Sequence, residues 1–199
     1  FLGLTGANIN VSDGLAIGLG DVAIAHESKA AVMSALSELN WDSDPQRHDS
    51  QVSEALAGFA LAADTLPQSP VSEHRDEIDR LCGGDDLSQV VEAITGLDSD
   101  DRWLSKAAAT LARGCPQTAA LVWENWHRGA DMTLADVFRM EWRVAVQCAL
   151  HGDFQEGVRA LLIDKDGQPR FKHRSVSDIT PAYLCLLYTS DAADEVQCV

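Results

Sequence analysis

The stretch Asp153–Arg174, DFQEGVRALLIDKDGQPRFKHR, decides how this sequence is interpreted. Asp153 and Glu156 stand three residues apart at the start of a helical pattern, where carboxylates can accept hydrogen bonds from free backbone amides. Although the chain has 31 acidic and 15 basic residues, five basic ones gather here, namely Arg159, Lys165, Arg170, Lys172 and Arg174. This basic corner indicates that the C-terminal third can accept an anion.

The segment before it, TLADVFRMEWRVAVQCALHG, predicts the longest helix of the chain. Its apolar residues recur at steps of three and four and therefore share one face. That face consists of Leu134, Val137, Phe138, Trp142, Ala145 and Cys148. Glu141 falls inside it, and a buried carboxylate needs a partner or a proton. We expect Glu141 to form an ion pair or hydrogen bond, with use as an acid or base as the alternative.

The rest of the chain also predicts a mainly α-helical fold. Apolar residues at three- and four-residue steps predict helices in KAAVMSALSEL, QVSEALAGFALAA, VSEHRDEIDRLC, DDLSQVVEAIT, DDRWLSKAAATLAR and TAALVWENWHR. A short helix should open at Ser12 or Asp13. The segment Val22–Ala25 is the single convincing strand.

Charge divides the chain into an acidic middle and a basic end. Residues 40–101 have 15 acidic and 3 basic side chains, whereas residues 102–174 have 8 acidic and 11 basic ones. Such a middle repels nucleic acid and anionic membrane surfaces. We therefore expect neither as a partner, and we interpret the acidic stretch as solvated helix faces.

The usual signatures of chemistry are absent from the sequence. The five cysteines, at positions 82, 115, 148, 185 and 198, form no CxxC pair, which favours neither a disulfide framework nor a metal site and fits a reducing compartment. No GxSxG, GxxxxGK[ST] or HExxH motif occurs. No apolar run approaches the roughly 18 residues of a membrane span.

The two ends of the chain lead to two expectations. Because Phe1 begins in the middle of a helical pattern, we expect a fragment of a longer protein. The segment CLLYTSDAADE, Cys185–Glu195, reads like the translation of a sequencing-library adapter, so we set residues 185–199 apart as a non-native tail. An ordinary acidic tail is the alternative.

Several blocks together resemble the crotonase superfamily, which includes the enoyl-CoA hydratases and isomerases. FLGLTGANINVSDGLAIGLGDVAI resembles the region after the active-site helix, and CPQTAALV resembles a later helix that begins with S-P. The blocks MEWR and DFQEGVRALLIDKD resemble the C-terminal helices of the 3-hydroxyisobutyryl-CoA hydrolases. That branch also has a helical insertion between the first two blocks, and here 98 residues separate Gly18 from Pro116.

The resemblance divides the chain into four segments. Residues 1–25 would be the end of the crotonase core, 26–114 an acidic helical insertion, 115–184 the C-terminal helical region and 185–199 the tail. The fold class implied is the C-terminal part of an α/β, ClpP-like spiral crotonase fold, with one short strand left in this part.

The resemblance also implies an activity, the hydrolysis of a CoA thioester such as 3-hydroxyisobutyryl-CoA in valine breakdown. The family's catalytic glutamate and aspartate would then precede Phe1, so no catalytic residue and no metal ligand is expected here. Lys165 matches a lysine with which the superfamily contacts a CoA phosphate; a favourable position at a helix C-terminus is the alternative.

Further expectations concern partners and place. CoA belongs to the substrate, so no separate cofactor is expected, and the C-terminal helices are candidates for contacts in a homo-oligomer. The compartment would be cytoplasmic for a bacterial protein and mitochondrial for a eukaryotic one. Two alternatives stay open: an enoyl-CoA hydratase or isomerase, and a helical protein-interaction module that presents its acidic middle to a basic partner.

Overall fold

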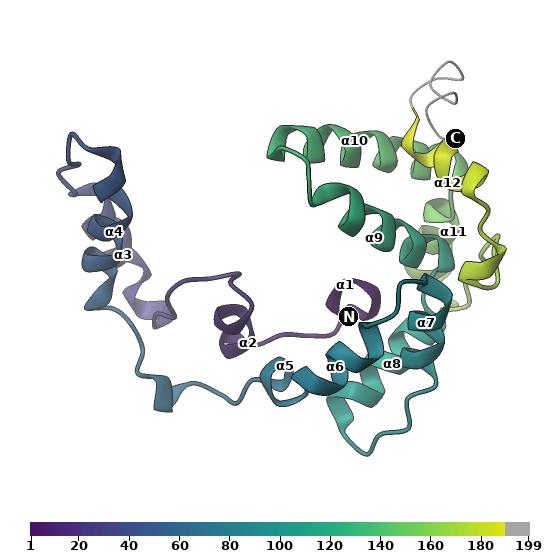
Figure 1. Cartoon of the computed structure of the whole chain (residues 1–199), viewed down its shortest axis with the longest axis horizontal. Helices are drawn as coiled ribbons and strands as arrows, with labels where there is room; N and C mark the ends of the chain where they lie inside the picture. The colour runs from purple at the N-terminus through teal and green to yellow at the C-terminus, as the bar shows by residue number, and fades with distance from the viewer. Residues whose placement is uncertain (190–199) are drawn as a thin grey trace. The chain divides into compact units, whose positions relative to one another are not determined.

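The computed structural model describes residues 1–189 and is built almost entirely from helices (Figure 1). The α-helices are α1 (Leu2–Thr5), α2 (Val11–Ala16), α3 (Lys29–Ser37), α4 (His48–Ala57), α5 (Pro70–Glu73), α6 (Arg75–Cys82), α7 (Leu87–Thr95), α8 (Arg102–Arg113), α9 (Pro116–Gly129), α10 (Leu134–His151), α11 (Phe154–Val158) and α12 (Pro181–Tyr188). Shorter helical turns are η1 (His26–Ser28), η2 (Pro45–Arg47), η3 (Ala63–Thr65), the π-helical η4 (Arg159–Ile163) and η5 (Val176–Asp178). The predicted mainly helical class is confirmed. Within residues 1–189, no helix has the length and apolar content that crossing a membrane requires.

In place of the strand predicted over Val22–Ala25, the structure has a single β-bridge. Ile24 pairs with Ala60 in antiparallel fashion, and the amide of Leu61 donates to the carbonyl of Ala23 at 2.8 Å. A ladder needs repeated pairs along both segments. The opposite segment enters η3 at Ala63, so pairing stops at once. The predicted strand is therefore correct in place and wrong in extent.

The chain divides into two units, which we describe separately. The acidic unit is Asn8–Ile78, and the core unit is Phe1–Ala7 with residues 79–189. Residues 26–114, the proposed insertion, contribute to both units. The segment boundaries derived from the resemblance stay a prediction.

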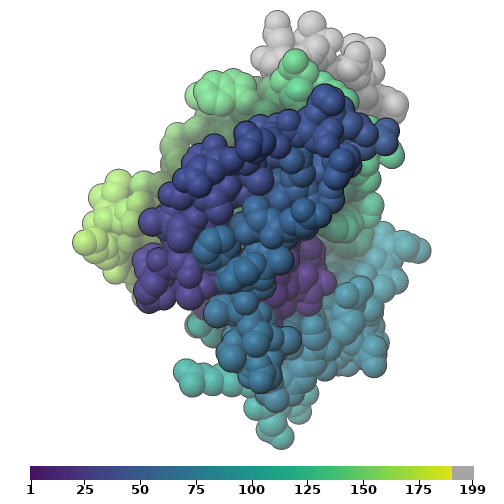
Figure 2. All heavy atoms as spheres, turned by 90° about the vertical axis from the view of Figure 1, so that its left-hand side faces the viewer, coloured from purple at the N-terminus to yellow at the C-terminus, as the bar shows by residue number. Residues whose placement is uncertain are grey.

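The acidic unit contains 12 acidic and 3 basic residues. Its two longest helices, α3 and α4, pack against each other. Their atoms are the dark-blue spheres on the face of Figure 2 that is turned to the viewer. Val32 is the buried residue of α3, and α4 has none. This pair of helices therefore has little apolar core.

A buried carboxylate joins the two ends of the acidic unit. Asn10, and not the predicted Ser12 or Asp13, caps α2, and it forms a capping box with Asp13. The Oδ1 of Asp13 also accepts hydrogen bonds from the hydroxyl of Ser69 at 2.6 Å and from the amide of Val71 at 2.9 Å. Burial by itself raises the pKa of Asp13, but the hydrogen bonds from Ser69, Asn10 and Val71 outweigh it, so the pKa is lowered. Asp13 therefore holds α2 against the start of α5 as a carboxylate.

The core unit is built around two apolar clusters. The first joins α6, α7, α8 and α9 through Leu81, Val90, Ile94, Ala108, Leu111 and Ala119. The second joins α9, α10 and α12 through Leu121, Met140, Val144, Leu187 and Tyr188. Local signals fix the helix starts: Asp101 caps α8 by accepting two amide hydrogen bonds, and Pro116 begins α9.

The face of α10 that is buried differs from the predicted face. Met140 and Val144 lie inside, whereas the side chains of Leu134, Phe138 and Trp142 are 72%, 63% and 72% exposed. α12 packs against α10 and thereby selects the face that carries Met140 and Val144. Glu141 is exposed as well, so the expectation that it needs a partner is wrong.

Part of the predicted tail is packed into the core unit. Cys185–Tyr188 form the last turns of α12, where Leu187 is fully buried. The hydroxyl of Tyr188 donates to the Oδ1 of Asn125 at 2.6 Å, and the guanidinium of Arg128 lies 4.2 Å from the centre of the Tyr188 ring. Leaving residues 185–189 out of the fold is therefore wrong as a structural expectation. Their origin stays a prediction, and the rest of the tail, 190–199, lies outside the described residues.

Candidate functional site

Arg159 organises the stretch that opened the sequence. Its guanidinium donates to both carboxylate oxygens of Glu156 at 2.9 and 2.8 Å, to Asp164 at 2.5 Å and to Asp166 at 2.8 Å. Hydrogen bonds to Glu156 and then to the two aspartates raise the pKa of Arg159. The positive charge of Arg159 is therefore paired with carboxylates of the same basic corner.

The carboxylates that start this stretch have partners other than those predicted. Asp153 makes no side-chain capping bond to α11; its Oδ1 accepts from the amide of Lys172 at 2.8 Å. Glu156 accepts from the amide of Arg170 at 2.6 Å as well as from Arg159. These bonds, Arg159 first, lower the pKa of Glu156 to about 2. The predicted capping role is wrong because both carboxylates bind the returning segment 170–172.

Lys165 stands at the turn between Asp164 and Asp166. Its backbone φ is 55°, a left-handed conformation that residues other than glycine rarely adopt. Its side chain is exposed and has no hydrogen bond or ion pair with the residues that the structure describes. The ammonium is therefore presented to solvent, just after the turn η4.

A cavity of about 470 Å³ lies beside this turn in the core unit. Its apolar lining comes mainly from α11, η4 and the segment that follows, and consists of Leu121, Phe154, Val158, Leu161, Leu162 and Phe171. Phe154, Leu161 and Leu162 are 62%, 64% and 68% exposed. The cavity therefore offers accessible apolar surface on the turn that ends just before Lys165.

A buried amide forms the polar side of the cavity. The Oε1 of Gln117 accepts from the amide of Asp153 at 3.2 Å and from the hydroxyl of Tyr183 at 2.8 Å. Its Nε2 donates to the sulfur of Cys148 at 3.4 Å. Nothing in the sequence marked Gln117, because its partners lie 31 to 66 residues away.

Two thiols line the same cavity, and both are held protonated. Burial raises the pKa of Cys115 and of Cys148. The thiol of Cys115 lies 3.7 Å from the Oδ2 of Asp153, a carboxylate that disfavours a second negative charge. Residues 1–189 also contain no group of three or more side chains placed to hold a metal ion. The site is therefore equipped for binding: an apolar surface, a hydrogen-bonded floor and a nearby ammonium.

Comparison with known proteins covers nearly the whole chain. A family model described as enoyl-CoA hydratase/isomerase matches residues 1–186. The chain is 28% identical over 192 residues to the mitochondrial 3-hydroxyisobutyryl-CoA hydrolase of Danio rerio, and 27% identical over 192 residues to that of Xenopus laevis. Each match covers 96% of this chain and 48% of the relative, so the chain spans about half the length of these relatives.

Solved structures give the same picture of the fold. A carnitinyl-CoA dehydratase from Mycobacterium thermoresistibile is similar at 25% identity and a TM-score of 0.71, over 95% of this chain and 50% of that one. An enoyl-CoA hydratase from Rhodobacter sphaeroides is similar at 25% identity and a TM-score of 0.72, over 98% of this chain and 51% of that one. Both likenesses agree with the fold class expected from the sequence.

Proposed function

Because the chain belongs to the enoyl-CoA hydratase/isomerase family, we propose that it is part of an acyl-CoA thioester hydrolase. The reaction is the conversion of 3-hydroxyisobutyryl-CoA and water into 3-hydroxyisobutyrate and CoA. One observation carries this proposal: relatives with that activity in their names match 96% of the chain. The block LIDKD and the long helical stretch between Gly18 and Pro116 support the same branch of the family.

Within this enzyme, the chain supplies a binding surface for the acyl-CoA. Lys165 binds a CoA phosphate, since its ammonium is exposed and has no partner among residues 1–189. The apolar side chains of Leu161 and Leu162 receive less polar parts of the substrate. No cofactor takes part, and the attack on the thioester belongs to residues that this chain does not contain.

An enoyl-CoA hydratase or dehydratase is the second candidate, favoured by the two structural neighbours. The two reactions are distinguished by product. A hydrolase releases a free CoA thiol, which a thiol reagent detects, whereas a hydratase removes the absorbance of the enoyl thioester and releases no thiol.

The first experiment assays thiol release from 3-hydroxyisobutyryl-CoA. The 199-residue chain alone should release no more CoA than a heat-killed control, whereas an enzyme of the relatives' length that includes this chain should turn the substrate over. Thiol release by the 199-residue chain alone contradicts the proposal that the residues that attack the thioester lie outside this chain. Enoyl hydration without thiol release by the longer enzyme contradicts the hydrolase.

The second experiment tests Lys165 by calorimetric titration of CoA into the 199-residue chain. Lys165→Glu should weaken binding about tenfold, because it replaces a phosphate-binding cation by an anion. Lys106→Glu makes the same charge change at an exposed position on α8 and is the matched control. If the two variants bind CoA with equal affinity, Lys165 does not bind a CoA phosphate, and its favourable position at a helix C-terminus is the alternative.

A further inference from the structure

Lys165 has an unusual backbone conformation, and the turn that imposes it is built around Arg159. Among residues 1–189, Lys165 is the one residue other than glycine with a positive φ. Such a conformation costs free energy and persists only where the surrounding structure holds it. The residues that hold this turn are therefore candidates for a role in what Lys165 does.

Backbone hydrogen bonds fix the chain on both sides of Lys165. The amide of Asp164 donates to the carbonyl of Arg159, five residues earlier, at 2.8 Å, which is the π-helical hydrogen bond of η4. After Lys165, the amide of Gly167 donates to the carbonyl of Ala160 at 3.1 Å. The turn is thus closed onto the helical segment that precedes it.

One nitrogen of Arg159 joins the two sequence neighbours of Lys165. Its Nη1 donates to the Oδ2 of Asp164 at 2.5 Å and to the Oδ2 of Asp166 at 2.8 Å. Its Nε and Nη2 bind the two carboxylate oxygens of Glu156, which fixes the plane of the guanidinium. Both carboxylates beside Lys165 are therefore bound to Arg159, and neither pairs with the ammonium of Lys165.

Without Arg159, the two aspartates would oppose the binding of an anion at Lys165. A carboxylate next to a lysine in sequence can pair with its ammonium, and its negative charge repels a phosphate at the same place. Arg159 counters both effects because it binds both carboxylates. It also keeps the turn ordered, so that less conformational freedom is lost when a ligand binds.

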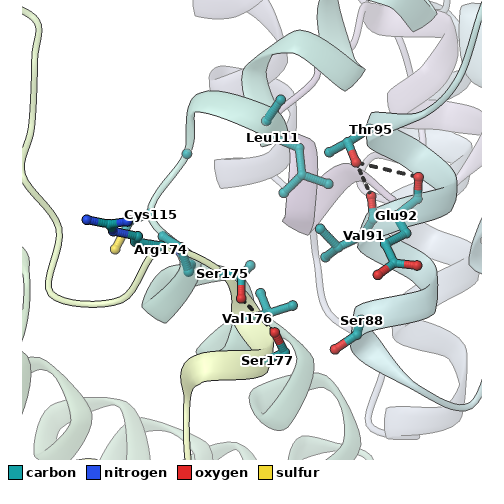
Figure 3. Close-up of a pocket in the computed structure, with 14 residues that line it drawn as sticks. Ser88, Val91, Glu92, Thr95, Leu111, Cys115, Arg174, Ser175, Val176 and Ser177 are labelled. Atoms are coloured by element: carbon teal, nitrogen blue, oxygen red, sulfur yellow. Dashed lines mark hydrogen bonds between the residues drawn. The ribbon is translucent and has the colours of Figure 1, made fainter.

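Arg174 is a second exposed cation of the basic corner, and it provides a contrast. In Figure 3 its guanidinium extends past Cys115, at the edge of a cavity of about 270 Å³. Like Lys165, it has no ion pair within residues 1–189. Its backbone φ is not positive, however, and its sequence neighbours are not acidic. The combination of a left-handed backbone and two neutralised neighbours is specific to Lys165.

We propose that Arg159 is a positioning residue, which holds the turn of Lys165 ready for a phosphate and keeps Asp164 and Asp166 away from it; this inference rests on the proposed binding of CoA by Lys165. Arg159 acts through the turn and not through contact with the ligand, since its guanidinium is bound to three carboxylates. The alternative is that Arg159 only stabilises the fold. The two roles differ in how the loss of Arg159 changes the affinity of a folded chain.

The first test is a calorimetric titration of CoA into Arg159→Gln. This variant should bind CoA at least about threefold more weakly than the unaltered 199-residue chain, because the two aspartates are released. Pantetheine, which has no phosphate, should bind both chains equally. Circular dichroism at the titration temperature checks that the variant is folded. Unchanged CoA affinity of folded Arg159→Gln, or an equal loss for pantetheine, overturns the positioning role.

A double-mutant cycle tests whether Arg159 acts through Lys165. Lys165→Gly removes the ammonium and suits a positive φ, so it should weaken CoA binding about tenfold without lowering the urea midpoint of unfolding. In this background Arg159→Gln should weaken CoA binding no further, because the residue through which it acts is gone. A full additional loss contradicts the proposal.

The same cycle separates this inference from the proposed function. If Lys165→Gly binds CoA as tightly as the unaltered chain, the CoA contact of Lys165 is wrong, and the positioning role is wrong with it. If Lys165→Gly binds weakly and Arg159→Gln binds normally, the contact stands and only the positioning role of Arg159 is wrong.

Two further variants are controls. Arg139→Gln removes an arginine–aspartate ion pair on α10, where Arg139 binds Asp136 at 2.7 Å, and should leave CoA affinity unchanged. Arg159→Lys keeps the positive charge, but a single ammonium lacks the planar fork that reaches Glu156 and both aspartates. It should therefore resemble Arg159→Gln. Full CoA affinity of Arg159→Lys shows that charge alone is enough and overturns the proposal.

Discussion

The acidic unit and the core unit hold their helices together in different ways. Of the 19 buried apolar residues among residues 1–189, the acidic unit contains Ala23, Val32 and Val71, and the core unit contains the other 16. The acidic unit depends instead on hydrogen bonds between α2 with its cap and the segment that leads into α5. Asp13 accepts from Ser69 and Val71, and the side chains of Asn10 and Ser12 donate to the carbonyls of Gln68 and Pro67. Because few apolar contacts oppose local opening there, we expect the acidic unit to open at lower free energy than the core unit.

Each of the two units contains a buried aspartate, and the two aspartates have different surroundings. Asp13 is fully buried, and its carboxylate accepts the hydrogen bonds of Ser69 and Val71 that join α2 to the start of α5. Asp153 is 8% exposed and ties Lys172 to the start of α11, but two apolar clusters stabilise the same unit. The same residue type therefore joins segments of a unit with little apolar core in one case and adds to an apolar core in the other.

The largest expected effect is the loss of apolar packing in the core unit. Ile94→Ala should lower the free energy of unfolding by about 2–5 kcal/mol, because it leaves a cavity at a fully buried position. Met33→Ala, at a position 60% exposed on α3, is the control and should change it by less than about 0.5 kcal/mol. Urea unfolding followed by circular dichroism measures both. Similar losses for the two variants contradict a packed apolar core around Ile94.

The next effect is the loss of the carboxylate that joins the acidic unit. Asp13→Asn should destabilise this unit by about 1–3 kcal/mol, because an amide replaces a charged acceptor of three hydrogen bonds. Hydrogen–deuterium exchange should show faster exchange in α2 and α5 and unchanged exchange in α7 and α8. The exposed Asp21 provides the control variant Asp21→Asn. If the amides of α2 exchange equally slowly in Asp13→Asn, the carboxylate of Asp13 does not hold α2 against the start of α5.

The smallest effect concerns the ion pair of Glu156 with Arg159, whose side chains are 22% and 30% exposed. The pKa of Glu156 falls from its ordinary 4.5 to about 2 in the folded chain. A carboxyl group whose pKa is lowered by folding stabilises above its ordinary pKa, and this stabilisation is lost as the pH falls through the folded value. The contribution of Glu156 is therefore full above about pH 4.5 and disappears toward pH 2.

A variant isolates this pH dependence. Glu156→Gln should unfold at a lower urea concentration than the unaltered chain at pH 6, and the two midpoints should approach each other at pH 3. Glu141→Gln, at an exposed position of α10, should give the same midpoints as the unaltered chain at both pH values, because Glu141 has no ion pair among the described residues. A constant gap between Glu156→Gln and the unaltered chain assigns the effect to packing and not to charge.

Much of the helical structure is predictable because its causes are local. Asp101 before Arg102, and Pro116 directly after Cys115, signal helix starts that the structure contains. The family is also predictable, since the blocks around MEWR and LIDKD lie in continuous sequence. Asp13 is not the residue that opens α2, because Asn10 is the N-cap and Asp13 completes its capping box. The capping role given to Asp153 fails because its side chain accepts from the distant amide of Lys172.

Neighbouring residues and their spacing are enough to predict the helical class, the division into acidic and basic parts, and the family. The tertiary structure alone decided that α10 buries Met140 and leaves Trp142 exposed, because α12 arrives from the far end of the chain. The tertiary structure also determines which charges of the basic corner are paired. Arg159 forms ion pairs with three carboxylates, whereas the side chains of Lys165 and Arg174 have no ion pair within residues 1–189. Hydrogen bonding depends on which groups meet in space, and spacing along a sequence does not contain that information.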